Sequence, residues 1–262
     1  MPMIQSNGAK LNAQIQGHPH APVLMLCNSL GTDLHMWDDQ AEAITQHFRL
    51  LRYDRRGHGK SEAPKGPYNM EMLARDALAV MDGMGVQKVN WCGLSMGGMV
   101  GMWLGANAAE RMDRVVLSNT SAWMADKQVW DGRFKTVRTG GMAAIADGTM
   151  ERWFTDEFKK VNPVRWREIR DTISGTTPQG FLGCATAIQN FDYLEKLATI
   201  KTPTMVICGD LDEGTPPDRN KLIASKIPGG RYEGIAAARH LPNVERPEQF
   251  NRIMMSWLAA NR

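Results

Sequence analysis

Short apolar runs, widely spaced and separated by helical stretches, constrain the fold more than any other feature of the sequence. They occupy Val23–Cys27, Leu50–Tyr53, Val89–Cys92, Val115–Ser118 and Met205–Cys208. Continuous apolar runs of this length are typical of strands buried on both faces. Helical stretches such as Met70–Met84 and Met99–Ala109 lie between them. Strands that alternate with helices predict an α/β fold with a mostly parallel central sheet flanked by helices.

The chain opens with a hairpin pattern, and its alternation of strands and helices stops after Ser118. Met3–Gln5 and Lys10–Ile15 flank Asn7-Gly8, a pair that favours a tight turn. Residues 121–192 look helical, contain four of the eight tryptophans, and are followed by the strand-like Pro203–Cys208. We predict a helical cap at 121–192, inserted into a core formed by residues 1–120 and 193–262. A second lobe of core is the alternative.

Composition excludes several classes of protein. The formal net charge of the 262 residues is +3 without a basic run, which argues against a nucleic-acid partner. No window approaches the ~18 apolar residues of a membrane span, and MPMIQSNGAK lacks the apolar centre of a signal peptide. The four cysteines have no metal-ligand spacing. We therefore expect a cytoplasmic protein with reduced thiols and no membrane partner.

The segment Gly93–Gly97 reads GLSMG and matches the pattern G-x-S-x-G. The pattern alone is weak evidence, but here it follows a buried strand and precedes a helix. In that setting the serine lies on a sharp, strained turn, and the glycines prevent clashes across it. N–H groups at a helix N-terminus favour negative charge nearby. A purely structural turn would need glycine but not serine, so we predict that Ser95 is a nucleophile.

A serine hydroxyl needs a base, and the sequence offers both a base and an acid downstream of Ser95. His240 is the only one of six histidines that follows Ser95. Asp210 and Asp212 both come just after the Met205–Cys208 run. We favour Asp212 because Thr215-Pro216 follows it at a spacing common in hydrolases that carry a serine nucleophile on a turn of this kind. Asp210 would then be a turn or capping residue. His240 would act as general base and then general acid, oriented by Asp212.

The other five histidines are weaker candidates. His18, His20 and His47 are expected in solvent, with His47 on a surface helix. His35 follows the first buried strand closely enough to approach the pocket. His58 lies in the turn Arg55–Gly59, whose glycines and charges indicate a structural role.

Two backbone N–H groups are needed to hold the oxyanion of a tetrahedral intermediate. Met96, directly after the nucleophile, should supply one. Leu30, in the loop after the Val23–Cys27 run, should supply the other. Many α/β-hydrolases carry His-Gly where this chain has Asn28-Ser29.

Five stretches of the chain together carry a family resemblance. They read NSLGTDLHMWDDQ, RYDRRGHGKSEAP, GLSMGGMVGMWLGANAAERMDRVVLSNTSA, GDLDEGTPP and RHLPNVERPEQF. With them the chain resembles the 3-oxoadipate enol-lactonases of the α/β-hydrolase superfamily over essentially its whole length. The NSLGTDL loop is the most specific piece and the cap is the least diagnostic.

The resemblance implies a carboxylic-ester hydrolase that opens 3-oxoadipate enol-lactone to 3-oxoadipate. This is a late step in the bacterial breakdown of protocatechuate and catechol, the β-ketoadipate pathway. The reaction would pass through an acyl-enzyme on Ser95 and would need no metal or organic cofactor. Some relatives carry a fused decarboxylase domain, which we do not expect here because the chain ends at Arg262.

The implied substrate carries a free carboxylate, and a dry pocket should offer it a charged hydrogen-bond donor. Arg133 is the preferred candidate because it lies among aromatic residues near the start of the cap, with Arg138 as the alternative. Trp130 is a further candidate for substrate contact, although tryptophans at such positions more often belong to the core.

Other functions on the same scaffold stay open at this point. A different carboxylesterase or lactonase, a haloperoxidase-like enzyme or a C–C bond hydrolase could use the same residues. A hydrolase-fold receptor that binds a small molecule with little turnover is a further alternative. A dehalogenase needs a carboxylate at the position of Ser95, so the serine argues against it.

Overall fold

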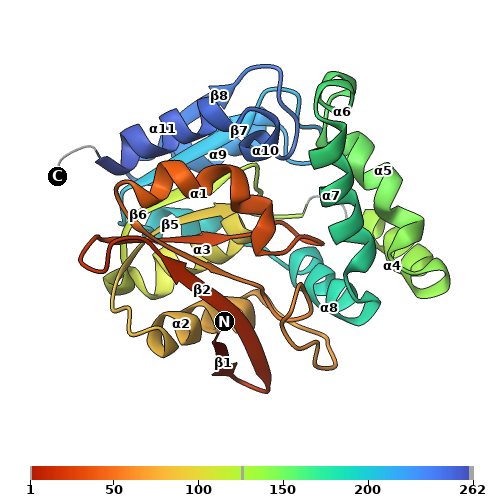
Figure 1. Ribbon diagram of the computed structural model, residues 1–262, viewed down its shortest axis with the longest axis horizontal. Helices are drawn as coiled ribbons and strands as arrows, with labels where there is room; N and C mark the ends of the chain where they lie inside the picture. The colour runs from red at the N-terminus through yellow and green to blue at the C-terminus, as the bar shows by residue number, and fades with distance from the viewer. Residues whose placement is uncertain (1, 125–126, 260–262) are drawn as a thin grey trace.

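The computed structural model describes residues 2–124 and 127–259. Within them, one sheet of eight strands has the order β1-β2-β4-β3-β5-β6-β7-β8 (Figure 1). The strands span Met3–Ser6, Ala9–Gln16, Val23–Cys27, Arg49–Tyr53, Val89–Leu94, Met112–Ser118, Thr204–Gly209 and Arg231–Ile235, numbered β1 to β8. The pairs β1–β2 and β2–β4 are antiparallel and the others are parallel. The predicted α/β fold with a mostly parallel sheet, including the N-terminal hairpin, is confirmed.

Helices cover both faces of the sheet. They are α1 (Asp38–Thr45), α2 (Met70–Gly83), α3 (Met96–Asn107), α9 (Pro217–Lys226), α10 (Pro242–Glu245) and α11 (Pro247–Ala259). In Figure 1, α1 and α11 lie in front of the sheet and contact each other, whereas α3 lies behind it against α2. The central strands are therefore buried on both sides, as in β3, where all five residues are buried.

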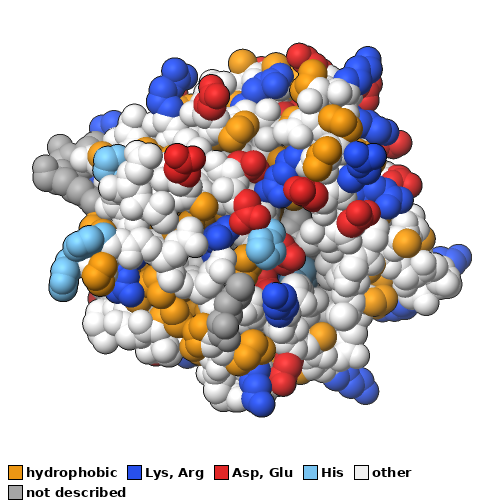
Figure 2. Space-filling model, viewed as in Figure 1, with side chains coloured by type: hydrophobic (Ala, Val, Ile, Leu, Met, Phe, Trp, Pro, Cys, Tyr) orange, Lys and Arg blue, Asp and Glu red, His pale blue; other side chains and the backbone are white. Residues whose placement is uncertain are grey.

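Five α-helices of the described residues, α4 to α8, lie between β6 and β7 and gather at one side of the molecule, in green to turquoise in Figure 1; we call them the cap. They are α4 (Gln128–Gly140), α5 (Ala143–Trp153), α6 (Asp156–Val161), α7 (Pro163–Gly175) and α8 (Pro178–Gln189). Within the cap, α4 packs on α5 and α8, and α5 packs on α7. Figure 2 shows acidic and basic side chains interspersed over the visible face of the cap.

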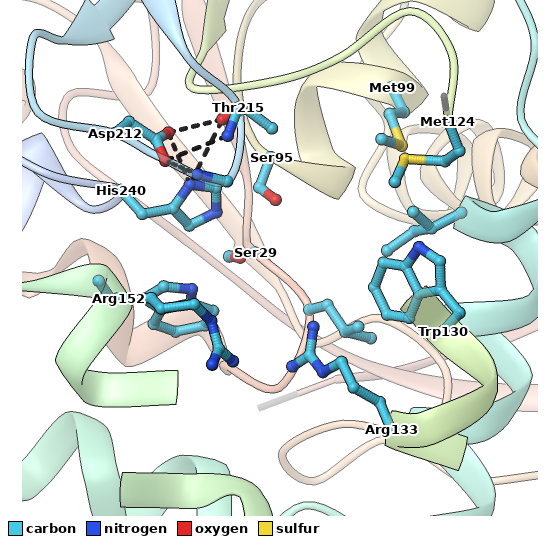
Figure 3. A pocket seen from close by; sticks show the side chains of 14 residues that line it. Ser29, Ser95, Met99, Met124, Trp130, Arg133, Arg152, Asp212, Thr215 and His240 are labelled. Carbon is cyan, nitrogen blue, oxygen red and sulfur yellow. Dashed lines mark hydrogen bonds and ion pairs between the residues drawn. The ribbon is translucent and has the colours of Figure 1, made fainter. Parts of the chain in front are cut away.

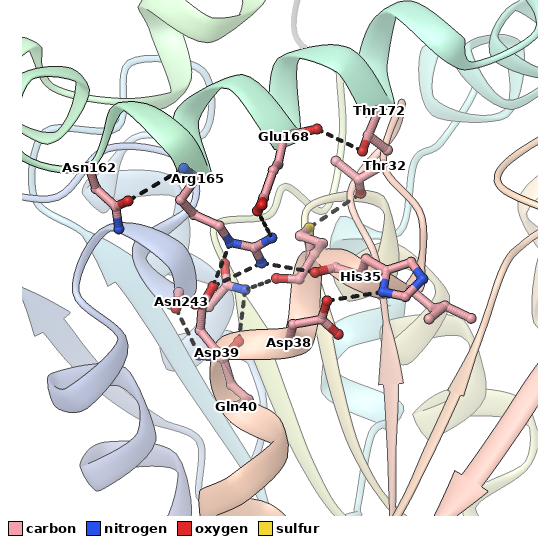
Figure 4. A network of polar contacts seen from close by, with 12 residues as sticks. Thr32, His35, Asp38, Asp39, Gln40, Asn162, Arg165, Glu168, Thr172 and Asn243 are labelled. Carbon is pink, nitrogen blue, oxygen red and sulfur yellow. Dashed lines mark hydrogen bonds and ion pairs between the residues drawn. The ribbon is translucent and has the colours of Figure 1, made fainter.

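A polar network ties the cap to the core (Figure 4). Arg165 of α7 donates to Asp39 Oδ2 of α1 over 2.9 Å and to the His35 carbonyl over 2.9 Å. A third contact, from Arg165 to Glu168 over 3.1 Å, stays within α7. The first two contacts cross between segments far apart in the sequence, so they fix one edge of the cap against α1.

Two details differ from the sequence predictions. The edge strand β8 was not predicted, because its residues are mostly exposed and form no apolar run. The helix expected from Met99 begins at Met96, so the predicted start is wrong by three residues. Gly97 and Gly98 look unsuited to a helix by propensity alone, but both are buried in its first turn.

Those glycines allow unusually close contact between backbones. A Cβ on Gly97 would lie 2.1 Å from the Cys27 carbonyl oxygen, and one on Gly93 would lie 2.0 Å from the Gly97 carbonyl oxygen. The start of α3 thus touches the end of β3 directly, and only glycine fits at these points.

Gly97→Ala should destabilise the fold, because the added methyl group meets backbone that cannot rotate away. We expect a loss of about 3 kcal/mol in the free energy of unfolding, measured by urea denaturation. Gly132→Ala in α4 is the matched control: its Cβ would meet nothing within 4 Å. Alanine there should stabilise by up to about 1 kcal/mol. Equal stabilities for the two variants would contradict the close backbone contact.

Candidate active site

Ser95 occupies the turn between β5 and α3 in a strained conformation. Its backbone angles are φ 57° and ψ −114°, a region that side-chain-bearing residues rarely adopt. The Ser95 N–H donates to the Ser118 carbonyl over 2.8 Å. The Ser95 carbonyl accepts from Thr120 Oγ1 over 2.7 Å. These bonds hold the turn, so the hydroxyl projects from the carboxyl end of the strand.

The Ser95 side chain lines a cavity between the core and the cap (Figure 3). The core contributes the ends of several parallel strands, and the cap covers them. The lining residues are Ser29, Leu30, Ser95, Met99, Met124, Trp130, Arg133, Arg152, Trp153, Ile188, Asp212, Gly214, Thr215 and His240. The carboxyl ends of parallel strands are where α/β folds place their ligands.

Asp212 and His240 form a buried pair in this cavity. Asp212 Oδ2 lies 2.8 Å from His240 Nδ1 and accepts from Asn119 Nδ2 over 2.8 Å and from Thr215 Oγ1 over 2.6 Å. Asp212 Oδ1 accepts from the Gly214 and Thr215 N–H groups. Burial alone would raise the pKa of Asp212, but the electrostatic interaction with His240 and the hydrogen bonds from His240, Thr215 and Asn119 outweigh burial and hold that pKa well below its usual range. Asp212 is therefore ionised and fixes the orientation of the imidazole.

Asp210, the alternative acid, lies elsewhere. It is exposed, and its N–H donates to the Ile235 carbonyl at the edge strand β8. The structure therefore brings Asp212, not Asp210, to His240. Asn119, which also holds Asp212, was missed from the sequence; it follows β6 with a positive φ of 44°. Its place at the end of a predicted strand is the one signal that could have drawn attention to it.

The two predicted N–H donors belong to segments at the cavity that Ser95 lines. Leu30 lines the cavity, and Met96 is the first residue of α3, where N–H groups lack intrahelical partners. A hydrogen bond to His58 holds the loop that contains Leu30, because the Gly31 N–H donates to His58 Nε2 over 2.9 Å. Burial and then the charge of Arg55 lower the pKa of His58 to about 3, so the ring stays neutral and can accept.

The remaining histidines lie away from the cavity. His35 Nδ1 is 3.0 Å from Asp38 Oδ2 in an exposed pair, so the expectation that His35 approaches the pocket is wrong. His18 and His20 are exposed, as expected. His47 is exposed but follows the end of α1 at Thr45 and is not part of that helix.

Arg133 points from α4 into the cavity (Figure 3). Its guanidinium carbon lies 5.0 Å from the centre of the Trp130 ring and 5.5 Å from that of Phe181. Its buried Nε has no hydrogen-bond partner among the described residues. Burial, and then the charge of Arg152, lower the pKa of Arg133 to about 10, so it stays charged near neutral pH. Arg133 is thus a half-buried cation with no ion-pair partner among the described residues.

Arg138, the alternative cation, lies outside this cavity. Its guanidinium carbon lies 5.7 Å from the centre of the Phe134 ring, and its side chain lines a separate groove between α4 and α8. Trp130 lines the cavity beside Arg133, and its contact with a substrate stays a prediction.

Two cavity residues at the end of α5 were missed from the sequence. Arg152 lines the cavity, and the ring of Trp153 lies 5.4 Å from that of His240. Trp153 was counted among the cap tryptophans, but nothing in its neighbourhood distinguishes pocket from core. Arg152 is one of many charged cap residues, and only the fold shows which of them turn inward.

Other kinds of site find little support. Across residues 2–124 and 127–259, no group of three or more His, Cys, Asp or Glu side chains could hold a metal ion. No helix in this part of the chain is long and apolar enough to cross a membrane. The four cysteines are buried and unpaired.

Comparison with known proteins places the chain in a family. Residues 22–247 match the model of the alpha/beta hydrolase fold family. The chain belongs to the α/β-hydrolases. It is therefore a hydrolase, as the sequence predicted.

Its similarity to particular hydrolases extends over almost its whole length. It is 33% identical to 3-oxoadipate enol-lactonase 1 of Acinetobacter baylyi, over 96% of this chain and 94% of that protein. The crystal structure of the enol-lactonase from Burkholderia xenovorans LB400 is 42% identical, with a TM-score of 0.96 and coverage of 98% and 99%. A putative carbamate hydrolase of Pseudomonas savastanoi is 26% identical over 93% of this chain and 96% of that protein. The resemblance to the 3-oxoadipate enol-lactonases is confirmed.

The depressed pKa of Asp212 predicts how stability depends on pH. Such a carboxylate stabilises the fold above the unfolded pKa of about 4, and this contribution is lost as the pH falls through the lower folded pKa. Asp212→Asn should therefore lower the free energy of unfolding at pH 7 by more than about 1.4 kcal/mol, the equivalent of one pKa unit. The gap to the wild type should narrow below pH 4 in urea titrations. Asp210→Asn, at an exposed position, should show no such gap, and a gap independent of pH would contradict the account.

Proposed function

We propose that this hydrolase opens 3-oxoadipate enol-lactone to 3-oxoadipate, with Ser95 as nucleophile, His240 as general base and acid, and Asp212 as the orienting carboxylate. One observation supports the proposal: the cavity joins Ser95 and the Asp212–His240 pair to Arg133, a half-buried cation with no ion-pair partner among the described residues. A neutral ester would leave that cation uncompensated, whereas a lactone with a free carboxylate would pair with it. The similarity to two enol-lactonases supports the same substrate.

In the acylation step, the strained turn at Ser95 supplies the nucleophile, and Met96 and the loop that contains Leu30 supply the N–H donors. Ser95 Oγ bonds to the lactone carbonyl carbon as its proton passes to His240. The N–H groups of Leu30 and Met96 hold the oxyanion that forms. The bond from that carbon to the ring oxygen then breaks, and His240 returns the proton to the departing enol oxygen. Because the ring opens within one molecule, the enol arm stays attached to the acyl group.

Deacylation repeats the same steps with water. His240 takes a proton from a water molecule whose oxygen bonds to the acyl carbon, and the same N–H groups hold the second oxyanion. The bond to Ser95 Oγ breaks, and His240 returns the proton to the serine. The released enol tautomerises to the ketone of 3-oxoadipate. No step requires a metal or an organic cofactor.

Arg133 and Trp130 would hold the end of the substrate remote from the reacting bond. The guanidinium lies over the Trp130 ring, so the indole positions the cation and also offers an apolar wall. A carboxylate bound there fixes the lactone ring relative to Ser95 without reacting itself. The binding energy of this remote carboxylate is thereby used to orient the lactone carbonyl carbon relative to Ser95.

We place this reaction in the catabolism of aromatic compounds in the cytoplasm. The compartment is supported by four buried, unpaired thiols, which suit reducing conditions. The pathway is supported by the enol-lactonase relatives.

Loss of ultraviolet absorbance of the enol-lactone, compared with a panel of simple esters, tests the proposal. We expect kcat/KM for the enol-lactone to exceed that for neutral esters by at least about 100-fold, since one charged hydrogen-bonded pair contributes about 1.5–3 kcal/mol and orientation adds to it. Ser95→Ala and His240→Ala should each remove most of the turnover, by about 10³-fold or more. Preference for a carbamate or a neutral ester would overturn the substrate. An active Ser95→Ala enzyme would overturn the mechanism.

A further inference from the structure

A second arginine lies beside Arg133 at the same end of the cavity. Arg152 comes from the end of α5, and both side chains line the cavity that holds Ser95. In Figure 3 the two guanidinium groups lie near each other, opposite the Asp212–His240 pair. The charge of Arg152 is close enough to act on Arg133, which makes this end of the cavity strongly positive.

Neither arginine has an ion-pair partner among the residues that the structure describes. Arg152 donates a weak hydrogen bond over 3.4 Å to Thr149 Oγ1, a neutral group. The Nε of Arg133 is buried without any partner. Desolvation lowers the pKa of both arginines, Arg152 adds its repulsion at Arg133, and Glu151 offsets only part of the effect at Arg152. An anion bound between the two guanidinium groups would therefore be stabilised.

We propose that Arg152 and Arg133 together clamp the free carboxylate of the substrate, and that Arg152 is a specificity-determining residue of this enzyme. This inference rests on the proposed function and extends it from one cation to two. A carboxylate has two oxygens, each able to accept a hydrogen bond from a different guanidinium. Arg133, which lies against the rings of Trp130 and Phe181, donates to one carboxylate oxygen, and Arg152 of α5 donates to the other.

The positive charge around Arg152 extends into a second cavity. This cavity adjoins the first, and both arginines line the two cavities. Arg219 lines the second cavity as well, and Glu213 is the acidic side chain among its described lining residues. The second cavity therefore adds positive charge next to the clamp. Arg152 is exposed, whereas Arg133 is half-buried, so Arg152 forms the more accessible half of the clamp.

The neighbour of Arg152 in the sequence connects this clamp to the chemistry. Trp153 packs its ring against His240, with the ring centres 5.4 Å apart. One turn of α5 thus supplies both a carboxylate contact and the surface that covers the catalytic base. A substrate held by Arg152 is therefore fixed to the same helix end that positions the His240 ring.

The affinity for adipate tests the clamp without any turnover. Adipate carries a carboxylate at each end of a chain as long as that of the expected product. Isothermal titration calorimetry should show that Arg152→Gln weakens its binding about tenfold or more, the loss expected for one charge-assisted contact. Arg133→Ala should weaken it at least as much. Arg138→Gln is the matched control, because it removes one cap arginine outside the cavity, and it should change the affinity less than about twofold.

Kinetics on two related lactones complete the test. One is the enol-lactone with its carboxymethyl group, and the other is the same ring with a methyl group in its place. Arg152→Gln should raise KM about tenfold for the first and leave the second unchanged. Unchanged adipate affinity in Arg152→Gln, equal losses on both lactones, or an equal loss in Arg138→Gln would overturn the clamp.

Two further results separate the possible failures. If Arg152→Gln unfolds, Arg152→Met keeps the apolar stem of the side chain and gives the same readout. If the wild type binds adipate in the predicted manner but does not open the enol-lactone, the proposed function fails and the clamp stands. If the wild type opens the enol-lactone but the Arg152 variants bind adipate as tightly as the wild type does, the clamp fails and the proposed function stands.

Discussion

The direct contact of three backbone segments beneath Ser95 is the constraint on which the rest of the structure depends. Gly97 at the start of α3 lies against the Cys27 carbonyl at the end of β3, and Gly93 in β5 lies against Gly97. No side chain separates these elements, so the turn that joins β5 to α3 has little freedom. Ser95 adopts a positive φ of 57° because the surrounding backbone and its hydrogen bonds leave no relaxed alternative. The same contact sets the Leu30 loop beside the Met96 N–H, since that loop begins where β3 ends.

Charge is distributed unevenly across the cavity that Ser95 lines. Core elements supply the Asp212–His240 pair, in which a negative charge is fully hydrogen-bonded. The cap supplies Arg133 and Arg152, positive charges without ion-pair partners among the described residues. A ligand with a polar reacting bond at one end and an anion at the other matches this layout. Under the proposed function the cap would contribute selectivity and the core would contribute the chemistry, a division by which one scaffold can serve many substrates.

Prediction from the sequence succeeded where a local signal existed. The strand β3 and its partners appear as apolar runs, and Asn7-Gly8 predicts the hairpin, because burial and turn chemistry leave marks in short stretches. The order of Ser95, Asp212 and His240 was also readable, since each follows a predicted strand or precedes a predicted helix. Their presence in one cavity agrees with the roles predicted for them.

Other features depend on contacts between distant segments and could not be predicted. Most residues of the edge strand β8 are exposed, so the sequence of β8 shows no apolar run or alternation that would predict its pairing with β7. Arg152 and Arg138 look alike in the sequence, yet one lines the cavity and the other lines a separate groove. Which of them faces inward depends on how α4 and α5 pack, a property of the cap as a whole.

The central claim is that Ser95 attacks the lactone and keeps the opened ring attached. Mass spectrometry of the intact enzyme, acid-quenched within milliseconds of mixing with the enol-lactone, tests it most directly. We predict a mass gain equal to the whole lactone, because the leaving enol stays tethered, and we predict that peptide mapping places the adduct on Ser95. A gain equal to only part of the lactone, or an adduct on another residue, would contradict the account.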